Sequence, residues 1–249
     1  MRQRKIKNID EKLMELSYLI VDNPEAIKGK WRKLFAAWAG EDCAARAGEA
    51  CTARTGEDCD TCAADAAGKS RDLYLEVGCG KGRFIKSMAE AHPEGVFVAA
   101  EGLASVVYRA ITKVHEAGIT NVRFVTDYVE RLDAWFEEGE LSGIFLNFSD
   151  PWPKARHSKR RLTYGGRLAQ YSKAIEVGGF IRFKTDNDNL FSFTIEQIEE
   201  IGEECGLEVT GLTRDLHNSE YRWDSPMTEY EEKFSNQGKN INYVELRKK

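Results

Sequence analysis

The sequence predicts an α/β fold with a seven-stranded, mostly parallel sheet, an antiparallel last strand and helices on both faces. Strand-like apolar runs alternate with helix-like patterns from Leu73 onward, as in βαβ units. The last two runs have no long helix between them, which indicates an antiparallel hairpin. With 249 residues, the chain can bury one substantial core.

Each element follows from its local pattern. We expect strands at the apolar runs Leu73–Val77, Val96–Ala100, Val122–Val125, Gly143–Phe148, Gly179–Lys184, Leu207–Leu212 and Ile241–Leu246. We expect helices where apolar residues recur at helical spacing, over Gly82–Ala91, Ser105–Ala117, Thr163–Ile175 and Leu190–Cys205. Sheets of this type bind ligands at the carboxyl ends of their central strands, so residues that follow those strands are the first candidates for a site.

The composition excludes several classes of protein. Hydrophobic residues at 42% and charged residues at 31% are typical of a globular chain, not of a disordered or fibrous one. The net charge of -5 argues against a protein that coats nucleic acid non-specifically, although it permits a local basic patch. No apolar run reaches membrane-spanning length and the basic N-terminus lacks a secretory pattern. We therefore expect a cytoplasmic protein without membrane contact, whose six cysteines are thiols.

The chain divides into three expected segments: a basic arm at 1–38, a low-complexity insertion rich in Cys and Ala at 39–71, and the sheet domain at 72–249. The insertion repeats the pattern of 39–43 near 47 and 55, and it has no large apolar residue that could form a core. A zinc site at Cys59-x-x-Cys62 is the alternative interpretation. Because the other cysteines of the segment follow the repeat and make no second close pair, we expect no metal.

A glycine loop follows the first strong strand. The segment Glu76-Val-Gly-Cys-Gly-Lys-Gly82 has the spacing Gly-x-Gly-x-Gly, so Gly78 and Gly80 allow a tight turn and close approach of a ligand. A dinucleotide loop normally has its third glycine one residue later, which favours S-adenosylmethionine over NAD. Glu76 could accept from an ammonium group, and Glu101 ends the second strand, where it could accept from ribose hydroxyls. A turn without a ligand and, for Glu101, a solvated strand end are the structural alternatives.

The fourth strand ends in Asp150-Pro-Trp-Pro153. The two prolines restrict the backbone, so Asp150 and Trp152 should be held over the sheet edge, where a carboxylate beside an aromatic ring suits guanine. Between Pro151 and Ile175 there is no acidic residue, and the run contains seven cations: Lys154, Arg156, Lys159, Arg160, Arg161, Arg167 and Lys173. Such a patch can neutralise RNA phosphates. A rigid core loop and a solvated helix face are the respective alternatives.

Five motifs together closely resemble the bacterial tRNA (guanine-N7-)-methyltransferase family. They are Asn147-Phe-Ser-Asp-Pro-Trp-Pro-Lys154, Arg156-His157, Lys159-Arg-Arg-Leu-Thr-Tyr164, Phe183-Lys-Thr-Asp-Asn187 and Thr228-Glu-Tyr-Glu-Glu-Lys-Phe234. The resemblance covers Leu73 to Leu246, and Lys28-Gly-Lys-Trp31 resembles the family's N-terminal segment. The chain departs from the family in Ala99-Ala-Glu101, which keeps the acid, and in the insertion, which has no counterpart.

The resemblance implies a Rossmann-like class I methyltransferase fold and methyl transfer from S-adenosylmethionine to N7 of the guanine at position 46 of the tRNA variable loop. It implies Asp150 as the catalytic residue and, around the cofactor, Glu76, Gly78, Gly80, Glu101, Asp150 and either Asp127 or Tyr128. For substrate and RNA it implies Lys154, Arg156, His157, Lys159, Arg160, Arg161, Asp186, Thr228, Glu229, Tyr230 and Glu231.

Two other functions remain as alternatives. An RNA-binding protein could hold the cofactor without transferring its methyl group, and a dinucleotide oxidoreductase is disfavoured by the glycine spacing. Guanine N7 already carries a lone pair, so positioning is most of what the enzyme must supply. Asp150 with Asp186 could fix the base, and whether Asp150 also acts as a base stays open. We expect tRNA as the partner and either a monomer or a homodimer.

Overall fold

The computed structural model describes residues 6–35, 71–222, 226–235 and 237–249. The expected insertion lies outside these residues, except for Arg71. Within the described residues, seven strands form one sheet in the order β3-β2-β1-β4-β5-β7-β6. Their bounds are β1 Leu73–Val77, β2 Val96–Ala100, β3 Val122–Val125, β4 Leu141–Asn147, β5 Ile175–Thr185, β6 Leu207–Thr213 and β7 Asn242–Lys248. Strands β1 to β5 pair in parallel, and β7 runs antiparallel to both β5 and β6.

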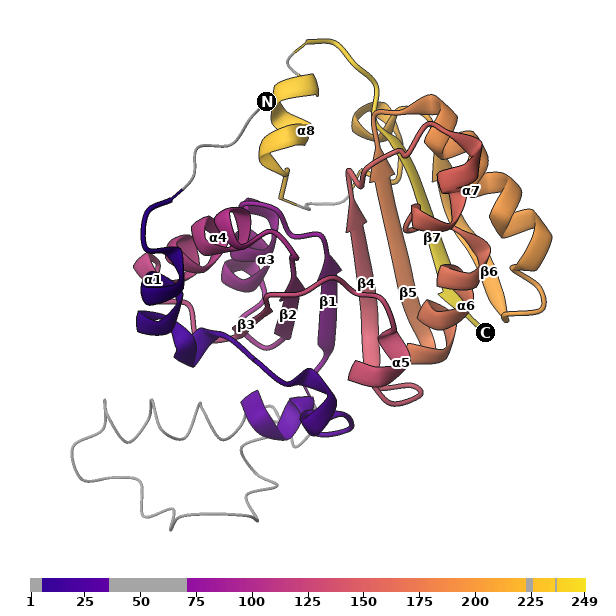
Figure 1. Cartoon of the computed structure of the whole chain (residues 1–249). Helices are drawn as coiled ribbons and strands as arrows, with labels where there is room; N and C mark the ends of the chain where they lie inside the picture. Colours follow the sequence, from indigo (N-terminus) through magenta and orange to yellow (C-terminus); the bar gives the residue numbers. More distant parts are fainter. Residues whose placement is uncertain (1–5, 36–70, 223–225, 236) are drawn as a thin grey trace.

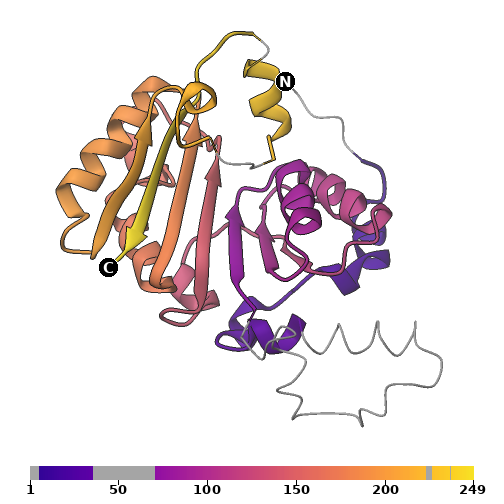
Figure 2. The ribbon, with the colours of Figure 1, turned by 180° about the vertical axis from the view of Figure 1, so that it is seen from behind.

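Helices cover both faces of the sheet (Figures 1 and 2). On one face, α1 (Ile9–Glu15), α3 (Arg83–Ala91) and α4 (Ala104–Glu116) lie over the β1–β3 side, with a core that includes Phe84, Ile111 and Phe124. On the other face, α5 (Leu132–Trp135), α6 (Gly165–Ala174) and α7 (Asp188–Ile201) bury residues such as Tyr171 and Phe191. The predicted class of fold, a mostly parallel sheet with an antiparallel last strand, is confirmed.

The N-terminal arm packs along the sheet domain. After α1, the turns η1 (Ser17–Leu19) and η2 (Pro24–Ile27) lead to a helical stretch at 31–35. Ile20 makes a parallel bridge with Phe124 at the edge of β3. The Trp31 side chain is fully buried, stacks on Phe136 with centroids 5.1 Å apart and donates from Nε1 to the Trp135 carbonyl oxygen at 2.8 Å. The family-like Lys28–Trp31 motif thus has a packing role.

Several boundaries differ from the sequence expectation. Strand β5 begins at Ile175, four residues before the predicted start at Gly179, because the chain passes through Gly178 at a φ of 80° and continues to pair with β4 around an irregularity. Helix α7 begins at Asp188, where the Asn187 side chain accepts from the Leu190 amide at 2.9 Å. Helix α8 (Glu229–Ser235) was not predicted, because its polar sequence carries no apolar periodicity.

Candidate active site at the carboxyl edge of the sheet

The carboxyl ends of β1 to β5 meet at one edge of the sheet, and α8 lies above their arrowheads in Figure 1. The predicted site residues follow these strand ends: the glycine loop after β1, Glu101 after β2, Asp127 and Tyr128 after β3, Asp150 after β4 and Asp186 after β5. Residues far apart in the sequence are therefore brought to one edge by the parallel topology.

The glycine loop has the backbone conformation that its spacing predicts. Gly78, Gly80 and Gly82 have φ angles of 78°, 57° and 77°, a region in which other residues are strained. A Cβ atom at Gly82 would lie 2.5 Å from Ala110 Cβ, so this glycine is needed for packing of α3 against α4. At Gly78 and Gly80, by contrast, a Cβ would meet no described atom within 4 Å. These two glycines leave open space in which a ligand can approach the backbone.

Glu76 is a buried carboxyl group at the end of β1, only 1% exposed. Its Oε1 accepts from Asn147 Nδ2 at 2.9 Å, whereas its Oε2 is buried without a hydrogen-bond partner in the described part of the chain. Burial raises the pKa of Glu76 to about 7, against the lowering effects of the Asn147 hydrogen bond and the Lys184 charge. A buried acceptor without a donor is costly, and a ligand ammonium would satisfy it.

Glu101 connects the glycine loop to the second strand. Its carboxylate accepts from the backbone amides of Gly80 at 3.2 Å and Leu103 at 3.0 Å. Glu101 therefore orders the loop in addition to any role toward a ligand. Tyr128, which is 58% exposed, lies against Gly102 so closely that a Cβ there would come within 2.5 Å of the ring. Asp127 is exposed and accepts from the Tyr128 amide at 2.7 Å.

The loop after β4 is conformationally strained around Asp150. Phe148 and Trp152 are non-glycine residues with φ angles of 51° and 40°. Such backbone costs about 1–3 kcal/mol per residue and persists where surrounding contacts enforce it, often at functional sites. Here the Phe148 amide donates to the Lys184 carbonyl oxygen at 2.9 Å, which anchors the start of the loop to β5. Asp150 is exposed and forms no hydrogen bond or ion pair within the described residues.

Arg161 holds the other side of this loop. Its guanidinium donates to the carbonyl oxygens of Pro151 and Trp152, each at 3.1 Å, and stacks 4.2 Å from the Phe193 ring centroid. Arg160 lies 4.9 Å over the Trp152 ring. Arg160 ends the turn η3 (Ala155–Arg160) and Arg161 follows it, and the same turn with the preceding residue carries the exposed Lys154, Arg156 and Lys159. The basic run therefore combines loop-supporting arginines with side chains open to solvent.

Helix α8 carries the predicted residues Glu229, Tyr230 and Glu231, directly after Thr228, and its acids contact basic side chains from four other elements. Glu229 pairs with Lys113 of α4, and Glu232 with Arg83 of α3. Glu231 is buried between Lys184 of β5 at 3.3 Å and His217 of η4 (Leu216–Asn218) at 3.4 Å. Thr228 Oγ1 accepts from the Glu231 amide at 2.9 Å, and Tyr230 packs on Phe148 with centroids 5.3 Å apart. The helix thereby joins both halves of the sheet edge.

Comparison with known proteins identifies the family. A family model described as "Putative methyltransferase" matches residues 70–244. A tRNA (guanine-N(7)-)-methyltransferase from Brevibacillus brevis is 38% identical over 245 residues, which cover 98% of this chain and 97% of that protein. The chain belongs to the tRNA (guanine-N7-)-methyltransferase family. The solved structure of an antibiotic-related methyltransferase matches 78% of this chain and 95% of its own with a TM-score of 0.53 at 14% identity, which shows the shared fold.

This methyltransferase-family site also contains residues to which the sequence gave no role. Asn147 and Lys184 lie inside recognised motifs, but only the folded chain shows that Asn147 binds Glu76 and that Lys184 binds Glu231. Lys239 pairs with Asp186 at 2.7 Å from a distant segment. No periodicity or spacing connects these partners, because each pair joins elements that are separate in the sequence.

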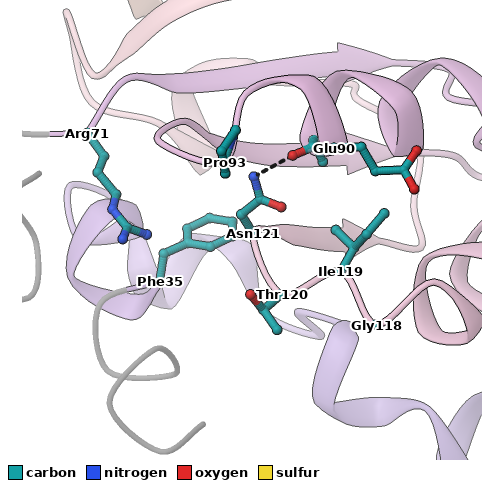
Figure 3. A pocket seen from close by; sticks show the side chains of 9 residues that line it. Phe35, Arg71, Glu90, Pro93, Gly118, Ile119, Thr120 and Asn121 are labelled. Carbon is teal, nitrogen blue, oxygen red and sulfur yellow. Dashed lines mark hydrogen bonds between the residues drawn. The ribbon is translucent and has the colours of Figure 1, made fainter. Parts of the chain in front are cut away.

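A cavity of about 290 Å³ lies at the opposite, amino edge of the sheet (Figure 3). Its lining includes Phe35, Arg71 and Asn121, and Figure 3 shows Asn121 turned toward the α3–β2 connection. The Asn121 amide donates to the carbonyl oxygens of Ala89, His92 and Gly95 at 3.2, 3.2 and 3.0 Å. The Asn121 amide thus joins the start of β3 to the α3–β2 connection. The cavity belongs to this structural contact and lies away from the candidate site.

No group of three or more His, Cys, Asp or Glu side chains within the described residues is arranged to hold a metal ion, and the clustered cysteines of the zinc alternative lie outside the ranges that the structure covers. No helix in those ranges is both long and apolar enough to cross a membrane.

Proposed function

We propose that this chain is a tRNA (guanine-46-N7-)-methyltransferase that uses S-adenosylmethionine and forms 7-methylguanosine in the variable loop. The proposal rests on two groups that lie at the ends of adjacent strands. The buried, partner-free oxygen of Glu76 at the end of β1 adjoins the open glycine loop, and the exposed Asp150 follows the neighbouring strand β4. The similarity to the Brevibacillus protein supports the choice of tRNA and of guanine N7.

The residues at the edge fit the cofactor. Glu76 would receive the ammonium group of the methionine moiety, and Gly78 and Gly80 would allow its close approach. Glu101 retains lone pairs for ribose hydroxyls after its two backbone contacts, and the exposed Tyr128 ring offers a flat surface beside it. When bound, S-adenosylmethionine supplies an electrophilic methyl group on a sulfonium.

The chain's own residues must then orient the guanine. N7 has a lone pair in the plane of the base, so no proton has to be removed before it attacks, and alignment supplies most of the rate enhancement. Asp150 can accept from N1–H and N2–H of guanine, which places the opposite, N7 edge toward the cofactor. Its negative charge also stabilises the positive charge that develops on the purine. The strained loop holds Asp150 in place, while Tyr230 packs behind Phe148.

The exposed cations of η3 and Lys154, which precedes it, would bind the tRNA backbone. Lys154 and Lys159 have no ion-pair partner within the described residues, and the whole run from Pro151 to Ile175 lacks acids. Phosphate contacts position an RNA without reading its sequence. This proposal therefore assigns orientation of the tRNA to η3 and selection of guanine to Asp150 and its neighbours.

Methyl transfer from labelled S-adenosylmethionine into unmodified tRNA, followed by nucleoside analysis, tests the function. We expect the label in 7-methylguanosine, and none in a tRNA whose guanine 46 is replaced by adenine. Asp150→Asn should reduce turnover by about 100-fold or more, the usual scale for a group that stabilises transition-state charge. Its melting temperature should stay within a degree or two of wild type, because the exposed side chain makes no described contact.

Asp133→Asn is the matched control, since Asp133 is an exposed carboxylate of α5, paired with Arg131 away from the site. It should methylate normally. Label in another nucleoside would overturn the choice of guanine N7. If Asp150→Asn turned over as fast as the control variant, Asp150 would not be the catalytic residue.

A further inference from the structure

Lys184 is a buried cation that the function proposed above does not use. It lies one residue before the end of β5, and its side chain, like that of Glu231, is only 2% exposed. A lysine is almost never buried this deeply without an anionic partner, because its ammonium loses hydration. Lys184 Nζ lies 3.3 Å from Glu231 Oε2 and 5.5 Å from the centroid of Phe84.

The position of Lys184 in the sheet connects the two groups of the site. Asn147 on β4 and Lys184 on β5 are paired in register, so their side chains lie on the same face of the sheet. Asn147 donates to Glu76 on β1, the candidate cofactor acid. Lys184 reaches the other way, to Glu231 on α8, the helix with the candidate substrate residues. The cross-strand pair Asn147–Lys184 therefore binds both candidate acids, Glu76 through Asn147 and Glu231 through Lys184.

Glu231 anchors α8 through this contact. The other ion pairs of the helix, Lys113–Glu229 and Arg83–Glu232, lie at partly exposed side chains, where water weakens them. Glu231 faces the interior, and its second oxygen is 3.4 Å from His217 Nε2 without hydrogen-bond geometry. Without the ammonium, Glu231 would have to stay charged without this partner, take up a proton or move toward water, and each of these weakens the attachment of α8 to the sheet edge.

We propose that Lys184 is a positioning residue for methyl transfer: its ammonium holds Glu231, and with it α8, in place beside Asn147, the cross-strand neighbour that binds Glu76. The proposal rests on the function proposed above. It implies that the seating of α8 and the environment of the candidate cofactor acid depend on the same cation.

Two variants separate charge from shape. Lys184→Met keeps the length of the side chain and removes the charge, whereas Lys184→Arg keeps the charge. Arg83→Met is the control, because it removes an α8 ion pair whose side chains are 39% and 50% exposed. All are measured as the full chain, with circular dichroism to confirm folding.

The first measurement is hydrogen exchange of the α8 amides without ligand. We expect exchange at least about tenfold faster in Lys184→Met, close to wild type in Arg83→Met, and intermediate or normal in Lys184→Arg. Glu231→Gln should reproduce the faster exchange. This second variant tests the same contact if Lys184→Met does not fold. Wild-type exchange in a folded Lys184→Met or in Glu231→Gln would overturn the anchoring role.

The second measurement is the pH midpoint of S-adenosylmethionine binding by calorimetry. Among the charges that act on Glu76, Lys184 favours the ionised carboxylate, whereas Glu101 and Glu229 oppose it. The midpoint should therefore move to higher pH in Lys184→Met and return toward wild type in Lys184→Arg, an effect that a purely structural role would not produce. An unchanged midpoint in Lys184→Met would overturn the link to Glu76.

The third measurement is steady-state methylation of unmodified tRNA. Lys184→Met should lower kcat/KM by more than about tenfold, with partial rescue by Lys184→Arg. Equal activity of the Lys184→Met variant and the wild type would overturn the positioning role. A wild type that binds S-adenosylmethionine but methylates no tRNA would instead overturn the proposed function, and the exchange and binding data would still decide the part that concerns Lys184.

Discussion

Burial changes the protonation behaviour of Glu76. Burial is the main cause that raises the pKa of Glu76 to about 7. Near neutral pH, protonated and ionised forms of this carboxyl group are therefore both populated. The folded protein holds this proton more tightly than the unfolded chain does. The contribution of Glu76 to stability is therefore present below its ordinary pKa of 4.5 and is lost as the pH rises through about 7.

We predict the opposite trend for ligand binding. An ammonium ligand needs the ionised carboxylate, so S-adenosylmethionine should bind about tenfold more tightly near pH 8 than near pH 6. Calorimetry across this range measures the effect. Glu76→Gln should bind weakly and without this pH dependence, and a variant with the wild-type pH profile would show that another group titrates.

At the scale of the element, the turn η3 and the loop before it have different tasks. Arg161 is committed to the carbonyl oxygens of Pro151 and Trp152, and Arg160 to the Trp152 ring. Arg156 and Lys159 are exposed on the same turn. The sequence predicts one phosphate-binding patch, whereas the structure separates cations that support the loop from cations that are open to solvent.

We predict that Arg156→Ala/Lys159→Ala weakens tRNA binding and reduces the slope of log Kd against log salt concentration by about one for each lost phosphate contact. Filter binding across a salt series measures the slope. Lys173→Ala is the control, because Lys173 belongs to the same basic run but lies in the last turn of α6, whose backbone contacts Gly139 beside the amino edge of the sheet. Equal slopes for the wild type, the double variant and the control would show that Arg156 and Lys159 do not contact the phosphates.

Arg161→Ala should behave differently from the η3 double variant. Loss of the guanidinium frees the carbonyl oxygens that it binds and loosens the strained loop around Asp150. We expect turnover to fall by about tenfold or more, because small displacements of a positioned group are costly, with a salt slope close to wild type. A reduced slope with normal turnover would instead make Arg161 a phosphate contact.

At the scale of the whole molecule, the two edges of the sheet have separate roles. The carboxyl edge carries the candidate site, whereas Phe35 and Arg71, the described residues on either side of the segment that contains the expected insertion, lie at the amino edge. These flanks lie close together: Arg32 Nε donates to the Arg71 carbonyl oxygen at 2.8 Å, and Phe35 and Arg71 line the same cavity in Figure 3. A short connection can therefore join them without disturbing the site.

We predict that replacing residues 39–70 with a short Gly/Ser linker preserves the fold and leaves kcat and KM for tRNA within about threefold of wild type, because Arg32 and Arg71 already lie in contact and a change in loop length alters the entropy of loop closure only slightly. Circular dichroism and the methylation assay measure the outcome. Metal analysis of the full-length protein accompanies it. Loss of folding on deletion, or one equivalent of zinc in the parent chain, would show that the segment is structural.

Local pattern determined the elements with the strongest periodicity and the most restrictive residues. The apolar runs placed β1, β2 and β3 at the observed bounds, because strands buried on both faces need uninterrupted apolar residues. The Gly-x-Gly-x-Gly spacing predicted the left-handed turns after β1, since only glycine adopts them without strain. The family motifs also identified, from the sequence alone, the chain's relationship to the tRNA (guanine-N7-)-methyltransferases.

Only the tertiary structure decided which side chains share an environment. Helix α8 is short and mostly polar, so its place depends on the contact of Tyr230 with Phe148 and on ion pairs with cations from α3, α4 and β5. The raised pKa of Glu76, the partners of Lys184 and the internal contacts of Arg161 likewise come from elements far apart in the chain. Sequence spacing specifies local backbone geometry, whereas burial and charge at a site depend on what the completed fold brings next to it.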